Sequence, residues 1–325
     1  MDLQFFDYNL NFLKQIPKSN TRWQLRYNDI GTFEGTMSLN NPFVTEAVER
    51  LNNKEFFIVR QGDYTAIIIG YDIQNSAVFY GRTCNWILTR RTSRKFAEAS
   101  FTPQAKARSL VSTAFSDCSN FILGDNIDSS DTVTFGKSTD GTTFDFVKEC
   151  LSLKNYGHSV TIDLVNKQWR FNVLQGIQRD FTRSEANKTA YDARLTFDIL
   201  DLADCGYYEK EVKATDASGN ETSSNVTTYL KRGNRSGILR WETLLSGSTE
   251  SEAAANLKLK KAKDGTTFST RNIKYGVDYE LGDILKLQLI KGLYRAPMSR
   301  RVTGVEISYS ENGYSERPIF EALEE

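Results

Sequence analysis

The C-terminal part of the chain contains the clearest strand pattern in the sequence. Leucine occupies every second position from 285 to 289, with Lys and Gln between, and a period of two is typical of a strand with one buried face. A second alternating run covers 305–309, and Asn312-Gly313 leads into a third run from Tyr314 to Phe320. Because Asn-Gly between alternating runs is a strong hairpin signal, we expect an antiparallel meander here.

The first ninety residues also predict strands. Short runs rich in Ile, Val, Phe and Tyr cover Glu55 to Arg60, Tyr64 to Tyr71 and Ala77 to Tyr80. Polar segments with glycine or aspartate separate them. Short strands at close spacing with polar turns favour a small barrel or sandwich.

The middle of the chain predicts helices as well as strands. Thr102-Pro103 is typical of a helix start, with a hydroxyl N-cap and proline in the first turn. Apolar residues at helical spacing predict a second helix from Thr143 to Asn155. Alternating runs at 160–164 and 169–173 then predict a hairpin, and together these elements indicate an α+β unit.

The pattern weakens from Thr182 to Gly237. The segment from Asp216 to Thr228 is rich in Ser, Thr, Asn and Asp and is predicted to be an exposed loop. Thr249 and Glu252 form a capping box for a helix expected to end at Gly265. The predicted class is mainly β with α+β: a barrel-like domain at 1–95, an α+β domain at 96–185, and a second barrel-like domain at 186–325.

Composition excludes few classes but disfavours two. The chain has 325 residues, with 41 basic and 41 acidic side chains and a net charge of +0, whereas a domain that binds nucleic acid is usually basic. No run approaches the roughly 18 apolar residues of a membrane span. The N-terminus has no basic and apolar signal segment, so we expect folding in a cytoplasm.

The residues that could carry catalysis or bind metal are few. His158 is the single histidine, and it lies beside a predicted turn with no partner visible in the sequence, so we interpret it as structural. Cys84, Cys118, Cys150 and Cys205 are widely spaced, without a CxxC pair. This spacing disfavours a zinc site and indicates free thiols in a reducing compartment.

Three acidic or glycine-containing patterns give weak signals. Gly136-Lys137-Ser138 lacks the earlier glycine of a phosphate-binding loop, since Asp131 occupies that position. Asp125, Asp128 and Asp131 lack the central glycine and closing glutamate of an EF-hand. Asp201 and Asp204 could act as an acid/base pair, but pairs this close are expected by chance among 41 carboxylates. No catalytic, cofactor-binding or metal residue is predicted.

A basic run is formed by Arg90, Arg91, Arg94 and Lys95. It could line a passage for nucleic acid, because cationic side chains pair with phosphates without reading bases. The favoured interpretation is a solvated linker between domains.

Several segments resemble a known family. Tyr-Gly-x-Asp-Tyr-x-Leu-Gly-Asp at 275–283, Arg-Val-Thr-Gly-Val-Glu at 301–306 and Glu-Asn-Gly-Tyr at 311–314 look like the baseplate hub, or tail-associated, proteins of long-tailed, siphovirus-like bacteriophages. The segments 26–34, 81–91 and 142–174 extend the resemblance, which is weakest at 182–245. Many relatives continue into host-binding or wall-degrading domains. This chain ends at Glu325, so those activities are not expected here.

The resemblance implies a structural role rather than an enzyme. It implies a homotrimer whose ring joins the six-fold tail tube to the host-facing tip and gates the passage of tape-measure protein and DNA. Partners would be distal tail or tube proteins, tape-measure protein, and tip or receptor-binding proteins, in a virion assembled in the bacterial cytoplasm. No cofactor is implied. A carbohydrate-binding or adhesive module of the tail tip, or a cell-wall hydrolase, is the alternative.

Overall fold

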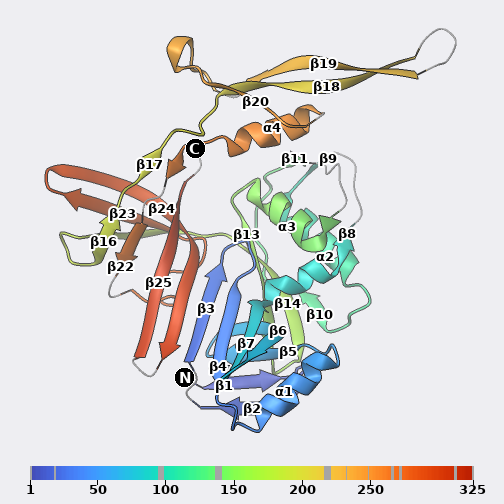
Figure 1. The fold of residues 1–325 in the computed structure, drawn as a ribbon, viewed down its shortest axis with the longest axis vertical. Coiled ribbons are helices and arrows are strands. Elements are labelled where there is room, and N and C mark those ends of the chain that lie inside the picture. The colour runs from blue at the N-terminus through green and yellow to red at the C-terminus, as the bar shows by residue number, and fades with distance from the viewer. Residues whose placement is uncertain are drawn as a thin grey trace. The chain divides into compact units, whose positions relative to one another are not determined.

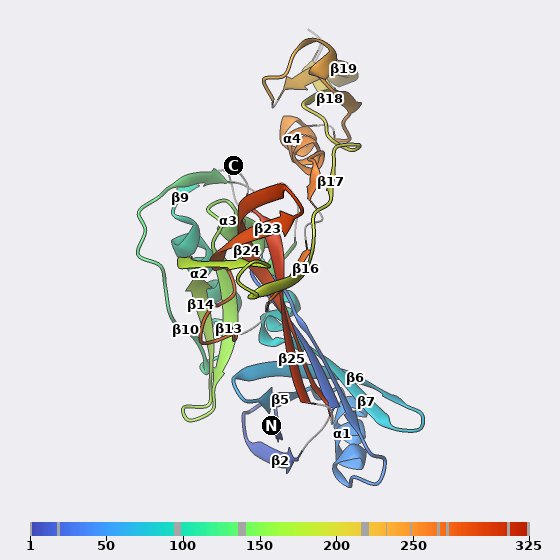
Figure 2. The ribbon, with the colours of Figure 1, turned by 90° about the vertical axis from the view of Figure 1, so that its left-hand side faces the viewer.

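The computed structural model describes residues 2–17, 20–93, 99–135, 141–215, 221–231, 233–247, 249–264, 267–270, 273–310 and 313–323. The chain divides into two compact units: unit 1 comprises residues 1–193 and 268–325, and unit 2 comprises residues 194–267. The predicted mainly β class is confirmed (Figures 1 and 2). No described helix has both the length and the apolar character needed to cross a membrane.

An eleven-stranded sheet dominates unit 1. Its neighbouring strands pair antiparallel except β15 and β23, which are parallel. The strands follow the spatial order β15 (Gln178–Ser184), β23 (Ile284–Lys291), β24 (Tyr294–Ser310), β3 (Asn20–Arg26), β4 (Thr32–Met37), β7 (Ala77–Thr83), β6 (Tyr64–Ile73), β5 (Phe57–Gln61), β1 (Leu3–Phe6) and β2 (Phe12–Ile16), with β25 (Gly313–Ala322) beside β24.

The two predicted barrels are not separate closed sheets in the structure. Strand β24 pairs with β3 from Gly304↔Arg26 to Tyr309↔Thr21, so the C-terminal meander and the N-terminal strands share one sheet, as Figure 1 shows in red and blue. The sheet is open, because its path ends at β15 and β2. The predicted boundaries at residues 95 and 185 stay a prediction, since one sheet can span more than one domain.

The strands β5 and β6 are buried on both faces. Phe57 and Val59 of β5 belong to the core that also holds the leucines of β23, while the intervening Ile58 faces a second core. In β6, Ile68 and Ile67 divide between the two cores in the same way. Successive side chains of a strand point to opposite faces, so an almost continuous apolar run indicates a strand covered on both sides.

The second core is shared between the N-terminal strands and the predicted α+β unit. A three-stranded sheet has the order β10 (Phe121–Leu123), β14 (Gln168–Leu174), β13 (Gly157–Asp163). The predicted hairpin is confirmed, with β13 and β14 paired from Gly157↔Leu174 to Asp163↔Gln168. The helical elements of unit 1 are α1 (Phe43–Asn52), which the sequence analysis missed, the 3-10 helix η1 (Cys84–Arg90), α2 (Pro103–Ala114) and α3 (Thr143–Ser152).

Unit 2 is built on a long hairpin and one helix. Strands β18 (Cys205–Thr215) and β19 (Glu221–Lys231) pair along their whole length, and β20 (Glu242–Leu244) adds a short third strand. Helix α4 (Glu250–Leu259) begins with the predicted capping box but ends before the predicted Gly265, because Lys260 already has non-helical angles. A 3-10 turn, η2, covers Gly237–Leu239.

The predicted loop from Asp216 to Thr228 is wrong for its described part. Residues 221–228 belong to β19, and residues 216–220 lie outside the described chain. Threonine and valine favour strands when a partner strand is present, and β18 supplies that partner.

The remaining strands form four two-stranded sheets: β8 (Thr92–Ser93) with β12 (Gly141–Thr142), β9 (Ala99–Phe101) with β11 (Val133–Phe135), β16 (Ala190–Arg194) with β22 (Thr267–Thr270), and β17 (Phe197–Asp198) with β21 (Lys263–Asp264).

Candidate functional site

The segment that carries the family resemblance is a compact turn that enters β23. We call residues 274–283 the junction segment. The Asp278 carboxylate accepts a hydrogen bond from the Lys274 N–H at 2.8 Å, and the Asp278 N–H donates to the Lys274 carbonyl at 2.9 Å. The Gly276 N–H donates to the Tyr279 carbonyl at 3.0 Å. The Asp278 carboxylate thus closes the turn, and the φ of +81° at Gly276 favours glycine there.

Two tyrosines of the junction segment bind one carboxylate of β25. The hydroxyl of the fully buried Tyr279 donates to Glu316 Oε1 at 2.6 Å, and the Tyr275 N–H donates to the same oxygen at 2.7 Å. Burial, followed by the hydrogen bond to Glu316, raises the pKa of Tyr279 far above its ordinary value. This contact fixes the junction segment to the last strand of the sheet.

Asp283 ends the junction segment and holds β15 in place. It is 2% exposed and accepts hydrogen bonds from the Ile177 N–H at 2.9 Å, the Glu280 N–H at 2.9 Å and Arg179 Nε at 2.6 Å. A buried carboxylate is stable when it is paired and hydrogen-bonded in this way. Because three donors engage Asp283, it is a structural group rather than a free general base.

Tyr27 connects the junction segment with the α+β part of unit 1. Its ring fills the space beside two glycines, since a Cβ added to Gly157 or Gly282 would lie 2.3 or 2.4 Å from the ring. Gly282 also has a φ of +92°, which disfavours other residues. The Tyr27 hydroxyl donates to the Asn155 carbonyl at 2.9 Å. Burial raises the pKa of Tyr27 to about 12, although Arg301 opposes this shift.

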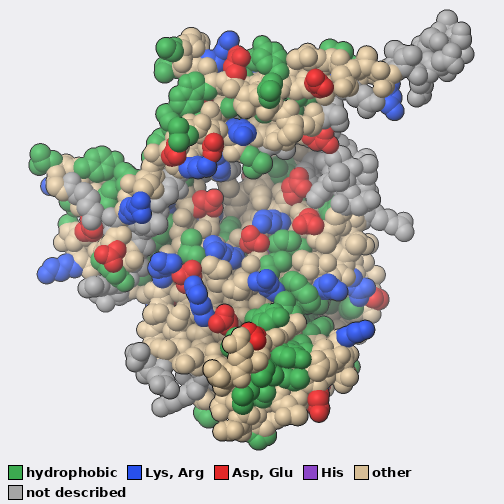
Figure 3. All heavy atoms as spheres, in the orientation of Figure 1, with side chains coloured by type: hydrophobic (Ala, Val, Ile, Leu, Met, Phe, Trp, Pro, Cys, Tyr) green, Lys and Arg blue, Asp and Glu red, His purple; other side chains and the backbone are tan. Residues whose placement is uncertain are grey.

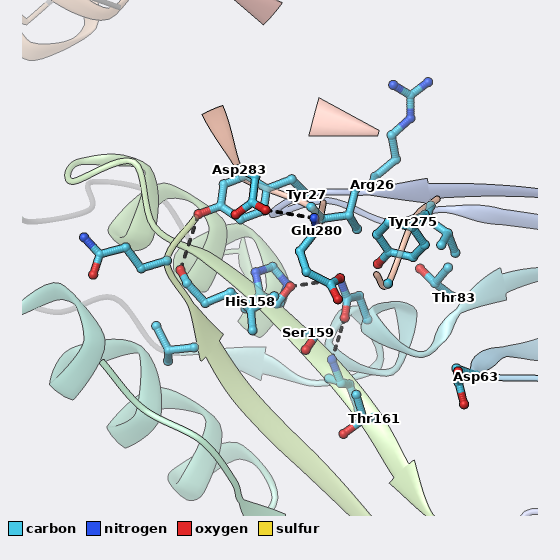
Figure 4. Close-up of a pocket in the computed structure, with 18 of the residues that line it drawn as sticks. Arg26, Tyr27, Asp63, Thr83, His158, Ser159, Thr161, Tyr275, Glu280 and Asp283 are labelled. Atoms are coloured by element: carbon cyan, nitrogen blue, oxygen red, sulfur yellow. Dashed lines mark hydrogen bonds between the residues drawn. The ribbon is translucent and has the colours of Figure 1, made fainter. Parts of the chain in front are cut away.

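Tyr27, Tyr275 and Asp283 line a cavity of about 920 Å³ in unit 1. Four carboxylates border it, those of Asp63, Asp128, Glu280 and Asp283. Figure 4 shows Asp63 on the opposite side of the pocket from Asp283, so these two do not converge as an acid/base pair. Burial, followed by the charge of Asp283, raises the pKa of Glu280. Within the described ranges, no group of three His, Cys, Asp or Glu could hold a metal ion.

His158 lies at the wall of this cavity with a buried ring. It is 1% exposed, and its Nδ1 lies 2.7 Å from Asn28 Oδ1. Because the Asn28 amide nitrogen donates to the Lys148 carbonyl and to Ser152 Oγ, its oxygen is the acceptor and Nδ1 carries the proton. Burial lowers the pKa of His158 to about 3. A ring that stays neutral and closed to solvent agrees with the structural interpretation.

The other predicted candidates have separate structural surroundings. All four cysteines are free thiols. Asp201 pairs with Lys263, and Asp204 pairs with Arg235 at 3.1 Å, so these two carboxylates bind different cations. Asp131 lies 3.4 Å from Lys154 Nζ. Gly136-Lys137-Ser138 lies outside the described residues.

The basic run divides in the structure. The guanidinium of Arg90 lies over the Trp86 ring at 5.3 Å, and Arg91 pairs with Asp117 at 2.9 Å. Arg94 and Lys95 lie outside the described chain. On the face drawn in Figure 3, Lys and Arg side chains alternate with Asp and Glu, which is the opposite of a continuous phosphate-binding stripe.

An aromatic groove of about 490 Å³ lies beside η1 and β10. Its rings pack against one another: Tyr8 contacts Phe56 at 6.3 Å between centroids, and Phe56 contacts Trp169 at 6.4 Å. Tyr8 is 44% exposed, whereas Trp169 is 5% exposed. The groove therefore combines the exposed Tyr8 ring with partly buried and fully buried rings, a feature that the sequence analysis did not locate.

No protein-family model and no curated protein matches the chain. Solved structures do match it over its whole length. The 43 kDa tail protein of prophage MuSo2 from Shewanella oneidensis has a TM-score of 0.57 and 10% identity, covering 99% of this chain and 98% of that one. The tail protein from Neisseria meningitidis MC58 has a TM-score of 0.56 and 10% identity, covering 98% and 96%.

A third match is the prophage tail protein gp18 from Listeria monocytogenes EGD-e, with a TM-score of 0.52, 12% identity, and coverage of 100% of this chain and 96% of that one. At such identities the likeness concerns the fold alone. The chain therefore has the fold of these three prophage tail proteins.

Proposed function

We propose that the chain is a structural subunit of a bacteriophage tail, acting as a baseplate hub. In this proposal three copies form a ring that joins the six-fold tail tube to the host-facing tip and gates the passage of tape-measure protein and DNA. Distal tail, tape-measure and tip or receptor-binding proteins are its partners in the virion. The observation that carries the proposal is the likeness to three prophage tail proteins over at least 98% of this chain.

The sheet of unit 1 supports an assembled state. Its path ends at β2 and β15, and each of these strands has one edge without a partner strand in the described chain. Open edges are stable when they are covered or paired, and closed rings of repeated contacts are the usual solution in homo-oligomers. Neighbouring copies or tail proteins would cover these edges.

Cryo-electron microscopy of the assembled tail tests this proposal. Three copies around one axis, between the tube and the tip and enclosing an open channel, are the expected result. Six copies per ring, or absence of the protein from purified tails, would overturn it.

The aromatic groove favours a second candidate function, an adhesive module that binds glycans. Aromatic rings pair with the apolar faces of sugars, and Tyr8 and Trp86 line the groove. Arg90 already lies over the Trp86 ring, which leaves Tyr8 as the most exposed ring of the groove and makes this function the weaker candidate. A glycan array tests it: binding that is lost in Tyr8→Ala and kept in the control Tyr80→Ala, another exposed tyrosine, would support it.

A further inference from the structure

The hairpin of unit 2 has two open edges. Strands β18 and β19 pair in full, from Cys205↔Lys231 to Thr215↔Glu221. On the other side of β18, β20 pairs only with Cys205–Tyr207. In the described part of unit 2, β18 is therefore open from Tyr208 onward, and the outer edge of β19 is open along its whole length. Figure 1 shows the two strands continuing past the end of α4.

The outer half of this hairpin is mostly exposed in the described part of unit 2. Tyr208 and Leu230 pack in the small core of unit 2, but residues 223–227 are exposed. Val212 and Val226, which are 38% and 48% exposed, continue the face of Tyr208 in the paired register. A two-stranded ribbon exposed on both faces is only marginally stable in water, so a neighbour is expected to cover it.

The edge of β19 differs from three open edges of the large sheet in unit 1. Strand β25 carries Glu316, Arg317 and Pro318, β15 contains two arginines and an aspartate, and β2 contains Lys14. Charges and proline on an edge prevent pairing with another chain. Between Thr222 and Leu230, β19 has neither a charged residue nor a proline, and its sequence is rich in residues that favour strands.

The same hairpin contains a matching edge. The sequence of residues 209–213 contains two acidic and two basic residues and has no net charge, so this part of β18 is not expected to repel an uncharged strand. Because β18 and β19 are antiparallel, copies placed head to tail around an axis bring β19 of one copy antiparallel to β18 of the next. This arrangement satisfies both edges of every copy, whereas pairing β19 with β19 leaves each β18 open.

We propose that the β18–β19 hairpin pairs with the hairpins of other copies of this chain, with β19 of each copy adding to the open edge of β18 in the next. In the trimer of the proposed function, on which this inference rests, three hairpins form a closed ring of six antiparallel strands. The hairpin is thus an assembly element of the protein rather than a surface loop.

The full chain is used for the test, with native mass spectrometry and amide hydrogen exchange over a range of concentration. The wild type is expected to form trimers as concentration rises, and the outward-facing amides of residues 222–230 are expected to exchange at least about tenfold more slowly in the trimer. A chain that stays monomeric at about 1 mM, where even weak association is populated, overturns the proposal.

Proline variants test the outer edge of β19 independently of the edge that pairs with β18. The N–H groups of adjacent residues point to opposite sides of a strand, so one of Asn225→Pro and Val226→Pro removes an outward donor and keeps the pairing with β18. That variant should remain monomeric while its hairpin amides exchange as in the wild-type monomer. The controls Asn225→Thr and Val226→Thr change the same side chains, keep the N–H groups and should form trimers.

Trimers formed by both proline variants, or wild-type trimers with unprotected β19 amides, would show that another surface joins the copies. Either result rejects the hairpin ring and leaves the tail function intact. The tail function fails separately, through the copy number and position of the protein in the assembled particle.

Discussion

The two units of this protein bury apolar surface in different amounts. Unit 1 contains two extended cores that include fully buried Trp23, Phe57 and Phe171. The described core of unit 2 consists of Ala203, Tyr208, Leu245, Ala253 and Leu257, with Leu230 packed against it. Small domains bury a smaller fraction of their surface and are correspondingly marginal. Unit 1 can therefore fold through its own contacts, whereas unit 2 has a small core and a long exposed hairpin.

Unit 2 also carries several large apolar side chains that are exposed. Ile238, Leu200 and Leu244 are 95%, 88% and 86% exposed. Single exposed apolar residues are common in soluble proteins, but this unit has several beside a core of few residues. In the proposed assembly, neighbouring subunits are expected to cover these side chains and stabilise unit 2.

The largest expected effect concerns the core of unit 1. Trp23 is fully buried, and its Nε1 donates to Gln61 Oε1 at 2.7 Å. Trp23→Ala should lower the free energy of unfolding of unit 1 by about 3–5 kcal/mol, because it creates a large cavity. Hydrogen exchange resolved by segment measures this. Phe12→Ala is the control, since Phe12 is 58% exposed, and equal losses in both variants would contradict the described core.

The next effect tests whether unit 2 unfolds by itself. Leu257 of α4 is 1% exposed, whereas Leu259 of the same helix is 77% exposed. Leu257→Ala should destabilise unit 2 by about 3 kcal/mol and leave exchange in the sheet of unit 1 unchanged, while Leu259→Ala should change little. Faster exchange in β3 and β24 as well would break the comparison, because the two units would then unfold together.

Acidification through the His158 titration should destabilise unit 1 and not unit 2. The folded pKa of His158 is about 3, below its ordinary 6.5, so the unfolded state binds the proton first. The contribution of His158 to the free energy of unfolding is therefore present above pH 6.5 and is lost as the pH falls toward 3. For unit 1 this loss is about 2 kcal/mol between pH 7 and pH 5. Unit 2 has no histidine.

Chemical unfolding at several pH values measures this slope. His158→Asn removes the titrating group and should flatten the dependence for unit 1 between pH 7 and pH 5, whatever its effect on absolute stability. An unchanged slope would mean that the pKa of His158 in the folded protein lies near its ordinary value.

The smallest effect lies in the terminal hairpin. Gly313 has a φ of +120°, which is accessible almost only to glycine. Gly313→Val should destabilise unit 1 by about 1 kcal/mol or more, because a β-branched residue resists this conformation. Ser315→Val in the same strand is the control. Equal melting temperatures for the wild type and Gly313→Val would show that the turn adapts without strain.

Sequence reasoning succeeded where structure depends on neighbouring residues. The alternating leucines at 285–289 form β23, residues 157–174 form the expected hairpin, and Thr249 with Glu252 forms the expected capping box. Of the expected Asn312-Gly313 turn, Asn312 lies outside the described residues. Gly313 begins β25 and pairs with Ser310. Alternation, capping and turn chemistry involve residues a few positions apart, so a single sequence contains their signals.

Other features depend on pairs of residues far apart in the chain, and only the tertiary structure decided them. The pairing of β24 with β3 joins the two ends of the sequence in one sheet. Asp283 binds Arg179, 104 positions earlier, and the Tyr27 ring requires glycine at both 157 and 282. Each of these contacts depends on which distant segment supplies the partner, and local composition does not specify that choice.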